Sequence, residues 1–277
     1  MNNAKTFLLM GSLMALFLLA GQLLGGSSGL VTAFVLGSLM NFAMYFWSDK
    51  LVLRMYRAHI VTPEHEPQLF ALVDRLRQQA GLPMPTLAVT EQEQPNAFAT
   101  GRSPERAVVA VTRGLLHFLP IDEVEAVIAH ELAHIKNRDM LIATVAAGIA
   151  GAVSYLPYLL MFGGRDDEGR HPALDLVLLL LAPIAATIIQ LAISRQREFE
   201  ADRVGAEILG RPQPLASALT RLDKLAHQIP MHVAPAAAPL AQVNPLAAQG
   251  RGFSRLFSTH PPTEERVAAL LALAGRR

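Results

Sequence analysis

The sequence contains no cysteine and few charged residues. Of its 277 residues, 17% are charged, and the net charge at neutral pH is +1. The absence of thiols excludes disulfide bonds, a thiolate metal site and a cysteine nucleophile, so any bound metal must be held by His, Asp or Glu. The near-zero net charge gives no basis for a nucleic-acid-binding surface. Since an average soluble domain is about 25% charged, the low charged fraction favours a membrane protein.

The sequence contains several long runs without a charged residue. Residues 6–48 carry no charged side chain and no histidine, and "GGSSG" divides them into two halves. Residues 140–164 and 176–194 are two further uncharged runs. Each is close to the roughly 20 residues that a helix needs to cross about 30 Å of hydrocarbon. The sequence therefore predicts four transmembrane helices, paired as hairpins over 1–48 and 140–194. The alternatives are a cleavable signal peptide for the first run and a buried soluble hairpin for the last two.

If the four runs cross the membrane in alternating directions, the basic residues that flank them fall on the same side of the membrane. They include Lys5, Lys50, Lys136 and Arg195. The exceptions are two arginines between the third and fourth runs, whose charge is offset by nearby acids. Because basic residues close to a span favour the cytoplasmic side, both termini and the two polar segments, 49–139 and 195–277, are predicted to be cytoplasmic.

The polar segments have mixed secondary-structure patterns. Apolar spacing predicts a helix over 62–83, followed by strands over 86–92 and 106–116 with a short edge strand at 96–101 between them. A helix then leads into the third uncharged run, and three helices follow the fourth run. Residues 229–250 contain four prolines among Ala and Gln, which predicts a mobile loop.

The strongest chemical motif is "HELAH", in which His130 and His134 are four residues apart. On a helix they share one face, with Glu131 beside it. In an H-E-x-x-H motif the two imidazoles bind Zn²⁺, and the glutamate takes a proton from a water that zinc has acidified to a pKa of about 7. The sequence therefore predicts one zinc ion per chain.

The third zinc ligand is predicted from the topology of the second hairpin. An antiparallel hairpin returns its two cytoplasmic ends to the same place, which brings "SRQREFEAD" beside "HELAH". Glu198 and Glu200 compete for the ligand position, because they point about 200° apart on a helix. Glu198 is preferred, since Asp202 shares its face and can orient a ligand histidine. Two histidines, one glutamate and a free fourth position form a catalytic zinc set.

Several motifs together resemble the HtpX family of membrane zinc metalloproteases, relatives of the CaaX prenyl-protein endoprotease. They are the N-terminal hairpin, "NAFATG", "HELAHIKNRD", "REFEAD" and "STHPPTEER". The resemblance covers nearly the whole chain and implies His130, His134 and Glu198 as ligands, Glu131 as catalytic base and Asp202 as their structural partner. The fold it implies is mostly α-helical, with four transmembrane helices and a cytoplasmic α+β zincin-like protease domain that contains a small sheet.

The same resemblance implies roles for two further segments. Asn96, Ala97 and Phe98 would form an edge strand that pairs with the substrate backbone, a mode that tolerates many sequences. His260 and Arg266 would steady the oxyanion of the tetrahedral intermediate. The sequence alone favours a plainer interpretation, in which "HPP" is a turn and Arg266 a surface residue at a helix start. The resemblance reverses this preference for His260 and leaves both interpretations open for Arg266.

The predicted function is therefore a zinc endopeptidase of the bacterial inner (plasma) membrane. Its substrates would be misfolded or membrane-associated polypeptides, cleaved at the cytoplasmic face as membrane-protein quality control. The alternatives are a prenyl-protein-type protease, an intramembrane protease and a catalytically silent scaffold. Lys136, Arg138 and Asp139 follow the motif directly and would be costly in hydrocarbon, which disfavours intramembrane chemistry. The intact Glu131 argues against a silent scaffold.

Overall fold

The computed structural model describes residues 2–147, 195–233, 238, 240–245, 247–249 and 261–275. Most of the second predicted hairpin and His260 lie outside these ranges.

The described elements are, in chain order, α1 (Asn2–Met55), β1 (His59–Ile60), α2 (Pro67–Ala80), β2 (Thr86–Thr90), β3 (Ala97–Gly101), η1 (Pro104–Arg106), β4 (Ala107–Thr112), α3 (Arg113–Phe118), α4 (Ile121–Lys136), α7 (Arg195–Leu209), α8 (Gln213–Ala226), η3 (Ala247–Gln249) and α10 (Thr263–Ala274).

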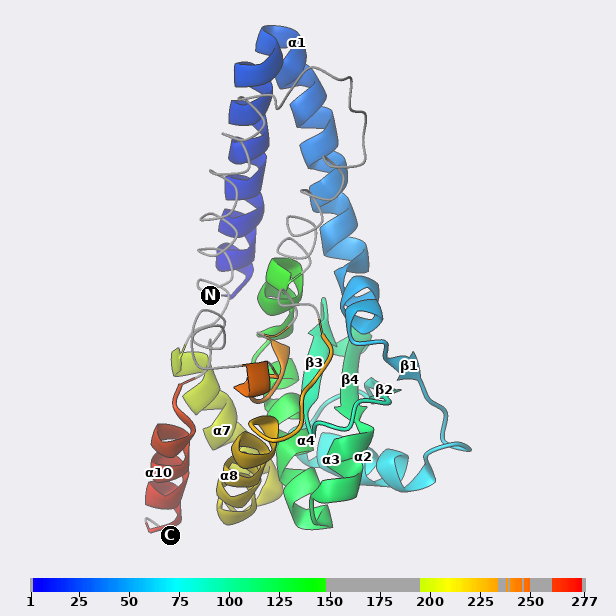
Figure 1. The fold of residues 1–277 in the computed structure, drawn as a ribbon, viewed down its shortest axis with the longest axis vertical. Coiled ribbons are helices and arrows are strands. Elements are labelled where there is room, and N and C mark those ends of the chain that lie inside the picture. Colours follow the sequence, from blue (N-terminus) through cyan, green and yellow to red (C-terminus); the bar gives the residue numbers. More distant parts are fainter. Residues whose placement is uncertain are drawn as a thin grey trace.

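The N-terminal element α1 is a hairpin of two helices, as predicted (Figure 1). The chain reverses at Gly25 and Gly26, whose backbone dihedrals are non-helical, with a φ of 56° at Gly26. The arms approach closely where Gly21 faces Gly29: a Cβ on Gly29 would lie 2.2 Å from the carbonyl oxygen of Gly21. A side chain at either glycine would therefore force the arms apart. The "GGSSG" segment thus supplies both the turn and one side of this contact.

One helix within the described residues, Gly25–Met55, is long and apolar enough to cross a membrane. Only 11% of its most apolar window is buried, so its large apolar side chains face outward. The other arm contains a shorter apolar helix, Thr6–Leu19. The start of the third uncharged run, residues 140–147, is helical and packs against this arm through Ile142 and Val145. Four spans remain a prediction, since residues 148–194 lie outside the described part.

The small sheet has four strands in the order β1-β2-β4-β3. β2 and β4 are parallel, whereas β1 and β3 pair antiparallel to their neighbours. β3 therefore lies at an edge, in agreement with the prediction of a short edge strand at 96–101. The two-residue strand β1 was not predicted, because it is too short for a period-2 pattern.

Both faces of the sheet are covered. On one face, alternate residues of β4 such as Val109 and Val111 join the main core with α2, α4, α7 and α8. On the other face, Val108 and Ala110 pack with Tyr56, directly after α1, and with Phe98. The end of α1 is thus continuous with the sheet that carries β3.

The strand predicted over 106–116 ends earlier, at Thr112, and the following residues form α3. The hydroxyl of Thr112 accepts a hydrogen bond from the backbone N–H of Leu115 at 3.0 Å, which caps the new helix. Gly114 permits a close approach, because a Cβ there would lie 1.8 Å from the carbonyl oxygen of Glu93. The apolar composition of residues 106–116 gave no indication of the helix start at Thr112 or of the close contact at Gly114.

The Pro/Ala-rich segment 229–250 was predicted to be a mobile loop, but its described residues are largely packed. Met231 and residues 240–243 within it are buried. The Gln94 side chain also donates to the carbonyl oxygens of Ile229 and Pro245, at 2.6 and 3.1 Å. The described part of the segment is therefore packed against the protein.

The close contact in the hairpin gives a first prediction. Gly29→Ala places a methyl group against the Gly21 carbonyl, so we expect it to lower the free energy of unfolding by about 1–3 kcal/mol. Gly11→Ala is the matched control, since a Cβ there meets nothing within 4 Å. The control should be neutral or stabilising, because alanine favours helix by up to about 1 kcal/mol. Unfolding in detergent micelles measures both, and equal effects would contradict the contact.

Candidate metal centre

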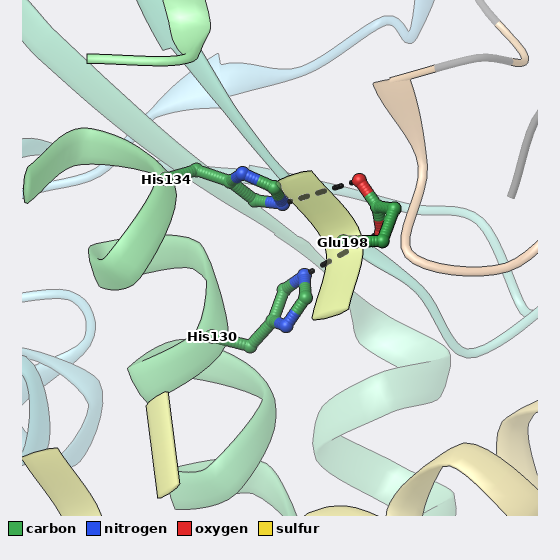
Figure 2. A group of neighbouring side chains, drawn as sticks. All are labelled: His130, His134 and Glu198. Atoms are coloured by element: carbon green, nitrogen blue, oxygen red, sulfur yellow. Dashed lines mark ion pairs between the residues drawn. The ribbon is translucent and has the colours of Figure 1, made fainter. Parts of the chain in front are cut away.

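Two helices that are distant in sequence form the centre of the site. α4 carries His130, Glu131 and His134, and α7 packs directly against it and carries Glu198 (Figure 2). Gly205 makes this packing close: a Cβ at that position would lie 3.0 Å from the backbone N and Cα of His130. A larger residue there would move α7, and Glu198 with it, away from the histidines.

Three donor groups converge between these helices. Nε2 of His130 lies 3.9 Å from Oε2 of Glu198, and Nε2 of His134 lies 3.6 Å from its Oε1. One ligand atom from each residue lies within 4.8 Å of the other two. Such spacing allows one ion to contact all three atoms. Glu200, the competing candidate, is exposed and pairs with Arg203 on the surface of α7.

Asp202 connects His130 to a third helix. Its Oδ1 lies 2.9 Å from Nδ1 of His130, and its two oxygens accept hydrogen bonds from Arg266 of α10 at 2.7 and 2.8 Å. All three side chains are buried. Because Asp202 occupies the Nδ1 side of the ring, His130 presents Nε2 to the site.

The two histidines differ in their electrostatics. Burial lowers the pKa of His130 to about 4, so the ring is neutral and can donate a lone pair. Burial also acts to lower the pKa of His134, but the hydrogen bond to Asp139 and the charges of Glu198 and Glu131 outweigh it and raise that pKa to about 9. The acids around His134 therefore create a negative electrostatic potential that favours a positive charge at this position.

Glu131 lies beside the donor group and is buried. Desolvation raises its pKa to about 7, together with the nearby charge of Glu198 and against the opposing effect of His134. A backbone hydrogen bond from Ala99 of β3 also stabilises its carboxylate. A carboxyl group with a pKa near 7 is well matched to accept and return a proton at neutral pH.

The charges of the site suit a divalent cation. Its four buried acids are Glu131, Asp139, Glu198 and Asp202. Within the described residues, two arginines act on them, Arg197 and Arg266. With all four acids ionised and both imidazoles neutral, as metal ligands must be, two negative charges remain unbalanced. Buried charge is costly without compensation. Two imidazoles and a carboxylate without any thiolate match the donor set of catalytic zinc sites.

Most predicted site residues meet at this point. Asn96, Ala97 and Phe98 lie on or beside β3, and Glu131 contacts the same strand through Ala99. Arg266 is buried in contact with Asp202, so it is not the surface residue that its sequence position allowed. His260 lies outside the described residues.

Two neighbours of the site were not predicted. Asp139 reaches His134 at 3.2 Å because the chain folds back after α4, where Arg138 adopts a positive φ of 58°. A five-residue separation does not share a helix face, so helical spacing could not reveal the pair. Gln242 is the second, from a segment with no recognisable motif.

Two histidines on α4 and one glutamate on α7, packed beside an edge strand, are typical of metallopeptidases with an H-E-x-x-H helix. Residues 63–274 match peptidase family M48. The chain belongs to this family, and it is a metalloprotease that hydrolyses peptide bonds.

Several proteins are similar over their full length. "Protease HtpX homolog" of Gemmatimonas aurantiaca is 58% identical over 99% of this chain and 100% of its own. The protein of the same name from Salinibacter ruber is 51% identical over 100% of this chain and 99% of its own. The resemblance to the HtpX family is confirmed by these relatives.

The crystal structure of S. mikatae Ste24p has a similar fold, with a TM-score of 0.51 and 19% sequence identity. The match covers 94% of this chain and 62% of Ste24p. The similarity extends to the fold alone.

The Asp202–Arg266 pair gives the second prediction. Arg266→Met leaves the Asp202 carboxylate buried without its partner, so we expect a loss of about 3–5 kcal/mol in the free energy of unfolding. Arg203→Met is the matched control, because Arg203 pairs with Glu200 and Glu207 on the exposed face of α7. It should cost less than about 1 kcal/mol. Chemical denaturation of both variants tests this, and comparable losses would contradict a structural role for the buried pair.

Proposed function

We propose that this chain is a membrane-bound zinc endopeptidase that cleaves misfolded or membrane-associated polypeptides at the cytoplasmic face of a bacterial inner membrane. The observation that carries the proposal is the convergence of His130, His134 and Glu198 with Glu131 beside them. The apolar hairpin of α1 supports the membrane location, as does the composition of the third and fourth runs.

His130, His134 and Glu198 would hold one zinc ion per chain. When bound, zinc supplies a Lewis acid that polarises a peptide carbonyl and acidifies water. Asp202 fixes the ring of His130, and Asp139 contacts Nδ1 of His134. Arg266 binds the Asp202 carboxylate through two of its nitrogens, and its Nη1 also lies 3.7 Å from Oε2 of Glu198. It is thus placed to position both Asp202 and the predicted ligand Glu198, and the oxyanion role that the resemblance implies for it stays a prediction.

Glu131 would act as the proton carrier. Its carboxylate would accept a proton from the attacking water and return it to the leaving amine. Its raised pKa of about 7 lets it do both near neutral pH. His260, by resemblance, would steady the developing oxyanion.

Asn96, Ala97 and Phe98 would bind substrate. Ala97 and Phe98 belong to β3, which lies at the sheet edge, and Asn96 directly precedes it. The carbonyl oxygen of Ala97 accepts a hydrogen bond from outside the sheet. An extended peptide bound there would pass beside Glu131, which contacts β3 at Ala99. Main-chain pairing depends little on side chains, and it suits an enzyme that meets diverse misfolded chains.

The test is Glu131→Gln, which preserves the shape of the side chain and removes its base. We expect kcat on an unfolded membrane substrate to fall by roughly 100-fold to 10,000-fold while zinc content is unchanged. Glu200→Gln, the same substitution on the exposed face of α7, is the control and should leave kcat unaltered. Undiminished cleavage by the Glu131 variant would refute the mechanism.

A further inference from the structure

The free edge of β3 is already occupied by the chain itself. The backbone N–H of Gln242 donates to the carbonyl of Ala97 at 3.0 Å. Next to it, the Asn96 side chain holds both backbone groups of Val243, donating to its carbonyl at 3.0 Å and accepting from its N–H at 3.4 Å. Residue 242 thus lies against residue 97 and residue 243 against residue 96, so the chain passes this end of β3 in the antiparallel sense. Residues 240–245 are called the covering segment.

The side chain of Gln242 reaches into the metal centre. With its amide nitrogen toward Glu131, it donates to Oε1 of Glu131 at 3.0 Å and to Nε2 of His130 at 3.1 Å, while its oxygen accepts from Arg266 at 2.9 Å. Gln242 is 2% exposed. Its amide therefore lies against the carboxylate that would activate water. Nε2 of His130 cannot accept this hydrogen bond when it binds zinc, so in the zinc-loaded protein the contacts with Glu131 and Arg266 would hold the amide.

Other contacts hold the covering segment in place. The backbone carbonyl of Gln242 accepts from Arg266 at 3.3 Å. Leu240 packs with Phe98 and Tyr56, and the carbonyl of Pro245 accepts from Gln94. The segment is thus held by one main-chain hydrogen bond to β3, by side-chain hydrogen bonds from Asn96, Gln94 and Arg266, and by apolar packing.

We propose that the covering segment is an internal substrate mimic that closes the active site, with Gln242 as its plug. This inference rests on the proposed function, because it assigns the edge of β3 to substrate. A substrate cannot pair with Ala97 or engage Asn96 until residues 242 and 243 leave. The apparent affinity for substrate is then reduced by the fraction of molecules in which the segment is open. An enzyme of broad main-chain specificity would in this way be restrained from cleaving folded neighbours.

The first arm of the experiment measures cleavage of an extended fluorogenic peptide by the full-length zinc-loaded protein. Gln242→Ala removes the side-chain contacts with Glu131 and Arg266, so we expect KM to fall by at least roughly 2-fold to 10-fold, the shift that the loss of one such hydrogen bond alone produces, with kcat little changed. Gln242→Asn, whose amide is too short to reach both Glu131 and Arg266, should act in the same direction. Gln228→Ala is the matched control, because Gln228 is exposed and precedes the segment.

The second arm does not depend on catalysis. Since the chain has no cysteine, Val243→Cys introduces a single thiol at a position that is 5% exposed. Asn96 holds only the backbone of residue 243, so the substitution preserves those contacts. In the Glu131→Gln background, a saturating peptide should displace the segment and raise the rate of thiol alkylation several-fold.

The outcomes separate the two proposals. A rise in KM or a fall in kcat/KM for folded Gln242→Ala protein, or an alkylation rate that peptide leaves unchanged or slows, would overturn the covering segment as a mimic while leaving the protease intact. Failure of the wild-type protein to cleave any peptide would instead overturn the proposed function, and the alkylation rate would still report whether the segment moves.

Discussion

The convergence of α4, α7 and α10 on one buried group of charges is the constraint on which the rest of this structure depends. Asp202 contacts His130 on one side and Arg266 on the other, so a single carboxylate ties the three helices together. The close contact at Gly205 brings α7 near enough for Glu198 to reach both histidines. Buried charge is unfavourable unless it is compensated, and a divalent cation would complete the balance. The packing that brings these helices together is therefore also the packing that would bind the metal.

Much of the site could be predicted because its parts follow simple periodicities. Helical spacing placed His130 and His134 on one face, and the antiparallel return of an uncharged hairpin indicated that Glu198 lies nearby. The membrane hairpin and the edge position of β3 also followed from local patterns. These features depend on interactions within one element or between neighbours, which a single sequence displays.

What could not be predicted depends on tertiary contacts without a sequence pattern. The apolar run after residue 106 concealed the helix start at Thr112, because only the capping hydrogen bond to Leu115 distinguishes it from more strand. Composition alone predicted a mobile loop for residues 229–250, whereas Gln242 is buried against the predicted metal centre. No local periodicity reports a hydrogen bond between residues 97 and 242. The burial of Arg266 likewise depends on Asp202, 64 positions away.

The central claim is that one zinc ion is held by two imidazoles of α4 and one carboxylate of α7. Zinc K-edge X-ray absorption of the purified full-length protein tests it most directly. The account predicts one zinc per chain, with two imidazole nitrogens and otherwise oxygen ligands, and a zinc content that drops when Glu198 is replaced by alanine. A folded, active protein whose metal shows fewer than two imidazoles, or whose zinc is retained without Glu198, would contradict it.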